Sequence, residues 1–68
     1  MKCAVVGDHS WKQTSEVIDM VNTNCDVEGE PRIPMKIGHF PPNEWFIEVI
    51  YEEDYPRLEK HLKYIMGL

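Results

Sequence analysis

The longest apolar stretch of the chain, WFIEVIYE at residues 45–52, contains mainly β-branched and aromatic residues and predicts a strand. Side chains alternate between the two faces of a strand, so one face of this segment is entirely apolar or aromatic. That face carries Trp45, Ile47, Val49 and Tyr51. The opposite face mixes apolar and acidic residues, namely Phe46, Glu48, Ile50 and Glu52. Because the first face needs cover from the rest of the chain, we expect this strand at the centre of a sheet.

The small size of the chain limits what it can bury. With 68 residues we expect one domain, and such a domain buries only about 60% of the surface of its unfolded chain. Domains this small often gain stability from a disulfide, a metal or a partner subunit. Cys3 and Cys25 are too few for a disulfide scaffold, and the opening residues MKCAVVG predict a strand rather than a secretion signal or membrane span. We therefore expect a reduced, cytoplasmic protein that self-associates.

The charge of the chain narrows the choice of partner. Its formal net charge is −5, from 12 acidic and 7 basic residues. This charge disfavours direct binding to nucleic acid or to an anionic membrane surface. It favours a protein partner that carries a basic surface.

The first half of the chain predicts a strand followed by a helix. Residues 2–7 form the strand, and Ser10 with Gln13 matches a capping box that starts a helix. The helix is expected to run from Ser10 to Asn22, because the segment Asn22-Thr23-Asn24 is typical of a helix end. One face of it is mainly apolar and carries Trp11, Thr14, Val17, Ile18 and Val21.

The middle of the chain predicts a loop, a second strand and a stiff connection. Residues 26–32 are polar, with a glycine and a proline, and indicate a loop. Residues 33–37 alternate between apolar and polar and predict a half-buried strand. Pro34 cannot donate a ladder hydrogen bond, so this strand is expected at a sheet edge. Residues 38–44 contain two prolines and indicate a connection into the central strand.

The end of the chain predicts a second amphipathic helix. Asp54 is a suitable N-cap, Pro56 fits the first turn, and Gly67 is a C-terminal cap. The apolar side chains of this helix recur on one face and are Tyr55, Leu58, Leu62, Ile65 and Met66.

The predicted fold class is α+β with the order β-α-β-β-α. The expected sheet has three antiparallel strands in the order 1-3-2, with both helices on one face, as a truncated ferredoxin-like layout. This layout leaves the edge of the first strand open. It also leaves Phe46 and Ile50 on the outer face of the sheet, where a partner can cover them.

The start of the first helix is the candidate ligand site. Its residues His9, Ser10, Trp11 and Lys12 combine a helix N-terminus with cationic and aromatic side chains that suit an anion. Residues 1–21 resemble the opening strand and helix of small nucleotide-binding α/β domains, which implies a nucleotide-like ligand. No glycine-rich phosphate-binding motif follows. In the alternative interpretation, Ser10 only caps the helix and Trp11 fills the core.

No metal, cofactor or catalytic residue is predicted. The ligand-type residues His9, His39, His61, Cys3 and Cys25 are not at zinc spacing. Cys3 lies in a predicted strand, where a buried thiol is inert, and Cys25 lies in a predicted loop near acids that raise its pKa. A chain of this length also has little volume for a water-excluding pocket. We therefore expect no enzyme activity.

Three further surfaces are candidates for partner binding. Two acidic groups can bind a cation, act as an acid/base pair or imitate a phosphate backbone toward a DNA-binding partner, unless they are only a solvated strand end and helix cap. They are Glu52-Glu53-Asp54 and Asp26-Glu28-Glu30. Arg57, Lys60 and Tyr64 share the predicted exposed face of the last helix. The loop of residues 39–43 presents Phe40 on a rigid, proline-containing segment, unless that ring packs under the sheet.

The chain type resembles the small accessory and inhibitor proteins of phages and mobile elements. This resemblance implies a non-enzymatic inhibitor or counter-defence protein that occludes a site on a larger host protein. One alternative is a homo-oligomeric sponge that holds a small anionic, nucleotide-like ligand at the first helix. The other is a structural assembly module that pairs its sheet with copies of itself.

Overall fold

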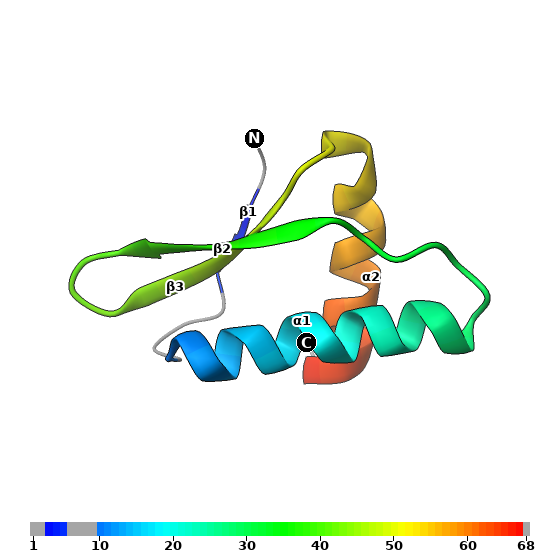
Figure 1. Cartoon of the computed structure of the whole chain (residues 1–68), viewed down its shortest axis with the longest axis horizontal. Coiled ribbons are helices and arrows are strands. Elements are labelled where there is room, and N and C mark those ends of the chain that lie inside the picture. Colours follow the sequence, from blue (N-terminus) through cyan, green and yellow to red (C-terminus); the bar gives the residue numbers. More distant parts are fainter. Residues whose placement is uncertain (1–2, 6–9, 68) are drawn as a thin grey trace.

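The computed structural model describes residues 3–5 and 10–67 of the chain (Figure 1). Its elements are β1 (Cys3–Val5), α1 (Trp11–Val27), β2 (Met35–Phe40), β3 (Glu44–Val49), the short 3-10 helix η1 (Glu52–Asp54) and α2 (Tyr55–Met66). The prediction of an α+β chain with an antiparallel sheet is confirmed. No helix of the described residues is both long and apolar enough to cross a membrane.

Strand β3 lies in the middle of the sheet and pairs antiparallel with β1 and β2, in the order β1-β3-β2. Ile47 faces Ala4 on one side and Ile37 on the other, and it is fully buried. Both helices pack on this face, where α2 crosses the direction of α1 (Figure 1). The core is built from Val17, Val21, Cys25, Ile33, Ile47, Val49, Leu58 and Leu62.

The central strand is shorter than predicted. It ends at Val49, and the chain bends at Ile50, whose backbone N–H still donates to the carbonyl oxygen of Pro34 (3.2 Å). Tyr51 was expected on the buried face, but η1 begins directly after it and leaves its side chain 56% exposed. The alternation of apolar side chains predicted too long a strand. It contains no signal for the bend at Ile50, where the chain turns toward α2.

Helix α1 begins as predicted but ends later. The side chain of Ser10 accepts from the backbone N–H of Gln13, and the Gln13 side chain accepts from the backbone of Ser10, which confirms the capping box. The helix continues to Val27, so the prediction of an end at Asn22 is wrong. The side-chain oxygen of Asn22 accepts the backbone N–H of Ile33 at 3.0 Å instead of competing for the helix backbone.

The longer helix places Cys25 inside α1 rather than in a loop. Its side chain is fully buried, one turn after the fully buried Val21. The chain leaves the helix through Glu28 and Gly29, and Gly29 takes the left-handed backbone angle φ 73° that favours glycine. Trp11, which one of the two interpretations placed in the core, is 59% exposed.

The connection predicted for residues 38–44 is mostly strand. Strand β2 continues to Phe40, so only residues 41–43 form the turn of a β-hairpin with β3. Gly38 lies opposite Phe46, whose ring occupies the space where a Cβ at position 38 would lie. The missing side chain lets an aromatic ring lie across the strand, and this cross-strand contact supports pairing through the glycine.

Helix α2 begins and ends where predicted, although the side chain of Asp54 makes no capping hydrogen bond. Asp54 occupies the N-cap position, proline lies in the first turn, and Gly67 adopts the left-handed C-cap conformation with φ 70°. Leu58 and Leu62 point into the core as expected. The unexpected member of this buried face is His61, which lies between them in the sequence.

Candidate functional site

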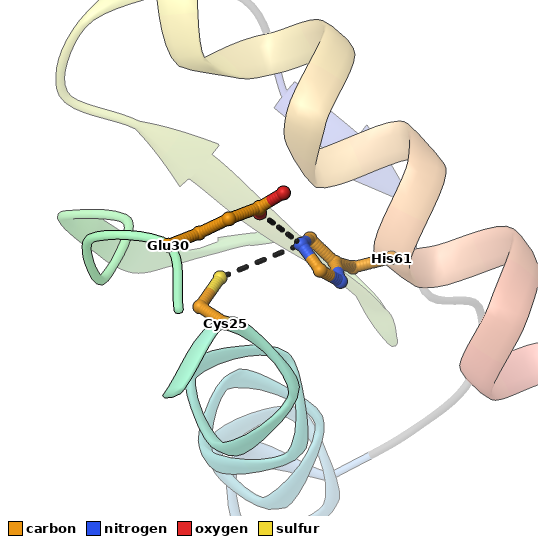
Figure 2. A group of neighbouring side chains, drawn as sticks. All are labelled: Cys25, Glu30 and His61. Carbon is orange, nitrogen blue, oxygen red and sulfur yellow. Dashed lines mark hydrogen bonds and ion pairs between the residues drawn. The ribbon is translucent and has the colours of Figure 1, made fainter. Parts of the chain in front are cut away.

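The buried face of α2 brings an imidazole against a thiol. His61 is 1% exposed and Cys25 is fully buried, and their side chains meet with 3.5 Å between Nε2 and Sγ. The contact joins residues 36 positions apart in the sequence. Glu30 completes the group, with its Oε1 atom 2.9 Å from the same Nε2 atom (Figure 2).

Glu30 is held in place by the end of α1. Its backbone N–H donates to the carbonyl oxygen of Cys25 at 2.8 Å, so the loop turns back over the last helical turn. This bond directs the carboxylate toward α2. The sulfur, nitrogen and oxygen atoms of Cys25, His61 and Glu30 all lie within 4.8 Å of one another. We call these three residues the CEH cluster.

Two cations from α2 surround the CEH cluster. Arg57 Nη1 lies 3.5 Å from Glu30 Oε1 and 3.6 Å from Cys25 Sγ, and it donates to the carbonyl oxygen of Pro31 at 2.6 Å. Lys60 Nζ lies 2.9 Å from Glu30 Oε2. Positions 57, 60 and 61 have the i, i+3, i+4 spacing of one helix face, so α2 holds the loop after α1 with three side chains.

The charges of the CEH cluster follow from these contacts. Hydrogen bonds from Lys60 and then His61 lower the pKa of Glu30 from 4.5 to about 2, so this group is a carboxylate at neutral pH. Burial raises the pKa of Cys25, and the opposing effect of Arg57 is smaller, so this group is a neutral thiol. At neutral pH the cluster therefore contains a Glu30 carboxylate and a protonated Cys25 thiol.

This arrangement is not that of a catalytic triad. A carboxylate only accepts hydrogen bonds, so Nε2 of His61 must carry the proton that it shares with Glu30. The same nitrogen faces the thiol and is not free to take its proton. In a working triad the two ring nitrogens contact nucleophile and acid separately. The buried thiol also has no exposed surface for a substrate.

Five residues of metal-ligand type were identified in the sequence, but none of them lie at zinc spacing. The fold brings two of these five together. Cys25 and His61 meet through the fold rather than through their spacing in the sequence. His39 lies in β2 against Trp45, away from them, with ring centroids 4.3 Å apart. His9 and the side chain of Cys3 lie outside the described residues. A sequence signal existed in the polar His61 between Leu58 and Leu62 on an otherwise apolar helix face.

The start of α1 is taken up by its own cap. Ser10 and Gln13 satisfy each other, and the Thr14 hydroxyl donates to the carbonyl oxygen of Ser10 at 2.9 Å. Trp11 and Lys12 are exposed beside this cap. His9, the other residue of the predicted ligand site, lies outside the described residues.

The two acidic groups predicted from the sequence differ in their surroundings. Glu52 and Glu53 in η1 are exposed and make no ion pair within residues 3–5 and 10–67. Asp54 lies 3.5 Å from Arg57.

The second acidic group, Asp26-Glu28-Glu30, is paired with cations of the chain itself. This corrects the interpretation of these residues as an acidic surface that is free for a partner. Asp26 contacts Arg32 at 2.8 Å, which lowers the pKa of Asp26. Glu28 lies 3.8 Å from Lys60. Glu30 belongs to the CEH cluster.

The predicted exposed face of α2 is corrected at Arg57. Arg57 and Lys60 are engaged with Glu30, and the Arg57 side chain is only 22% exposed. Lys60 stays 55% exposed despite its ion pair, and Tyr64 is 79% exposed. The long cationic side chains bend toward the loop because its acids lie beside their helix.

The β2–β3 hairpin carries aromatic pairs on both faces. Phe40 and Phe46 stack with ring centroids 4.8 Å apart on the outer face, while His39 and Trp45 stack on the opposite face. Phe40 is 54% exposed. In Figure 1 the turn of this hairpin extends beyond the start of α1. Phe46 is half-buried by its neighbours in the sheet, and Ile50 is 40% exposed.

Comparisons with known proteins give no information on the function of this chain. No protein-family model, no curated protein and no solved structure matches this chain.

Proposed function

We propose that this chain is a small, non-enzymatic, cytoplasmic binding protein that occludes a site on a larger host protein, as inhibitor and counter-defence proteins of phages and mobile elements do. The observation that carries this proposal is the β2–β3 hairpin, with stacked aromatic pairs on both faces and an end that extends past α1 (Figure 1).

The hairpin has the properties of a preorganised binding element. Its aromatic rings are held by cross-strand stacking before any partner arrives, which reduces the ordering cost of association. Phe40 offers a half-exposed ring, and the Phe46 ring beside it covers Gly38. Aromatic side chains at the centre of an interface often carry most of its binding energy. The hairpin therefore inserts into an apolar cleft of the partner.

Charge supports a partner with a basic rim around that cleft. The net charge of the chain is −5, and Glu44 is exposed on the hairpin beside its turn. The exposed Glu52 and Glu53 add negative charge after β3. Such charges mainly accelerate association and make it sensitive to salt, while the aromatic contacts set the dissociation rate.

The experiment is affinity capture of partners by the purified chain at low and high salt, with mass spectrometry and titration of the partner it identifies. The double variant Phe40→Ala/Phe46→Ala is expected to weaken binding by about 100-fold, which corresponds to about 2.7 kcal/mol. Val27→Ala is the matched control, because Val27 is 79% exposed and lies on α1. Equal binding by the double variant, with its circular dichroism unchanged, would contradict the proposal.

Two other functions from the sequence stay as alternatives with their own tests. A sponge for an anionic nucleotide is supported by the exposed Trp11 beside Lys12, and predicts a thermal shift with nucleotides that Trp11→Ala abolishes. An assembly module predicts concentration-dependent rings or filaments without ligand. We further propose the truncated ferredoxin-like layout for the sheet and helices. It is supported by the strand order but carries no function.

A further inference from the structure

We propose that Cys25, Glu30 and His61 form a binding site for a divalent transition-metal ion, with Zn²⁺ as the preferred cation. The inference does not rest on the hairpin or on the binding function proposed above. It rests on three donor atoms from three separate segments that converge at one point, where the thiol and the imidazole are buried and the carboxylate is partly exposed (Figure 2).

The donor set matches the chemistry of zinc. A thiolate, an imidazole nitrogen and a carboxylate oxygen are the ligands that proteins use for Zn²⁺. Zinc bonds of about 2.0–2.3 Å in a tetrahedral site place the ligand atoms roughly 3.3–3.8 Å apart. The Sγ–Nε2 separation of 3.5 Å already lies in that range, and the Nε2–Oε1 separation of 2.9 Å needs a small rotation of the Glu30 carboxylate.

A fourth ligand lies close by on the same loop. Glu28 Oε2 is 3.6 Å from Nε2 of His61, and the Glu28 side chain is 47% exposed, so it can rotate toward the ion. If it stays in solvent, water takes the fourth position. The Glu30 side chain is 26% exposed, which gives the ion a route to the buried sulfur and nitrogen along the carboxylate.

Arg57 lies where a positive charge contacts two of the three donor atoms of the CEH cluster, and the metal would replace it in these contacts. The Arg57 guanidinium contacts both Sγ and Oε1 and balances the charge of the carboxylate. When an ion binds between these atoms, Arg57 loses two contacts but keeps the carbonyl oxygen of Pro31 at 2.6 Å and Asp54 at 3.5 Å. The chain can therefore release Arg57 from the cluster without leaving it unpaired.

Metal binding exchanges protons for coordinate bonds. The S–H bond of Cys25 breaks and its proton goes to solvent, while Nε2 of His61 gives up the proton that it donates to Glu30 and binds the ion through its lone pair. Zn–S, Zn–N and Zn–O bonds replace the hydrogen bonds of the cluster. The thiol proton is thus released when an ion binds, so affinity must fall with decreasing pH.

The experiment uses Co²⁺ as a spectroscopic probe and Zn²⁺ as competitor, in a Cys3→Ser background that leaves Cys25 as the only thiol. We expect the visible bands of tetrahedral cobalt and a thiolate-to-cobalt charge-transfer band, both removed by an equivalent of Zn²⁺. Cys25→Ser is expected to abolish the charge-transfer band. Glu30→Gln is expected to weaken binding by about 10-fold or more.

Two controls separate this site from other acids and from the hairpin. Asp26→Asn removes the acid next to Cys25 and should leave cobalt binding unchanged. Phe40→Ala/Phe46→Ala should also bind cobalt normally, so loss of partner capture and loss of metal are distinguishable. Because cluster variants can fail to fold, alkylation of Cys25 in the Cys3→Ser protein is measured as well. Zn²⁺ but not Mg²⁺ should slow it.

Three results would overturn the assignment. The first is a cobalt spectrum without a charge-transfer band. The second is a band that persists in a folded Cys25→Ser variant. The third is alkylation of Cys25 at the same rate with Zn²⁺ as with Mg²⁺.

Discussion

The β2–β3 hairpin and the CEH cluster place their functional groups in opposite ways. The hairpin gathers its aromatic rings from residues 39–46, neighbours in the sequence, and leaves Phe40 54% exposed. The cluster joins His61 to Glu30 over 31 residues and to Cys25 over 36, and buries both the thiol and the imidazole. The difference teaches that the hairpin surface can change without unfolding the chain, whereas the cluster is part of what holds the helices together.

The largest effect on stability is expected from His61→Ala. The substitution leaves a cavity between α1 and α2 and removes one partner of Glu30, so the free energy of unfolding should fall by about 2–4 kcal/mol. Urea denaturation measures it. Tyr64→Ala on the same helix is the matched control and should stay within about 0.5 kcal/mol of the parent, because its ring is 79% exposed. Equal effects of the two substitutions would refute a structural role for the cluster.

The hairpin should be sensitive at one point, which is Gly38. A Cβ at this position meets the ring of Phe46, so Gly38→Ala should lower the free energy of unfolding by about 1–2 kcal/mol. The ring can swing outward, which keeps the cost below that of His61→Ala. In a Phe46→Ala background the same substitution should cost less than about 0.5 kcal/mol, measured as a double-mutant cycle. An unchanged cost in that background would show that the collision is not with the ring.

The pH dependence of stability should identify the cluster through Glu30. Its pKa in the folded chain, about 2, lies below the ordinary 4.5, so the ionised carboxylate stabilises the fold above that ordinary value. This contribution is lost as the pH falls from about 4.5 to about 2. The stability advantage of the parent over Glu30→Gln should therefore narrow across that window in urea titrations. Glu53→Gln, at an exposed position, should show no such narrowing.

The smallest effect on stability is expected from Phe40→Ala. The ring is half exposed and contacts Phe46 on the outer face, so the free energy of unfolding should fall by less than about 1 kcal/mol. Thermal unfolding measures this change. A loss comparable to that of His61→Ala would mean that the hairpin, like the cluster, is a structural element and not an open surface.

Much of the local structure could be predicted from the sequence. The capping box at Ser10, the span of α2 and the left-handed cap at Gly67 all follow from side chains within a few residues of each other. The missed end of α1 and the overlong central strand have the opposite cause. The Asn22 side chain accepts the backbone N–H of Ile33, and the backbone N–H of Ile50 donates to the carbonyl oxygen of Pro34. Both partners are distant in the sequence.

The candidate sites divide along the same line. The aromatic content of the hairpin was visible in the sequence, and Phe40 lies exposed there as one of the two interpretations expected. Arg57 and Lys60 were expected in solvent but bond to Glu30, because only the fold shows that the acidic loop passes beside α2. The CEH cluster was missed for the same reason, since its members lack any fixed spacing.

By itself, the sequence determined the order of the helices and strands and most of their apolar faces, because periodicity and capping act over one or two turns of chain. Only the tertiary structure decided which polar groups meet. The cluster exists because the packing of α2 across α1 brings His61 to Cys25, and because the loop after α1 folds back to add Glu30. Contacts between such distant residues depend on the packing of whole elements, which no short stretch of sequence encodes.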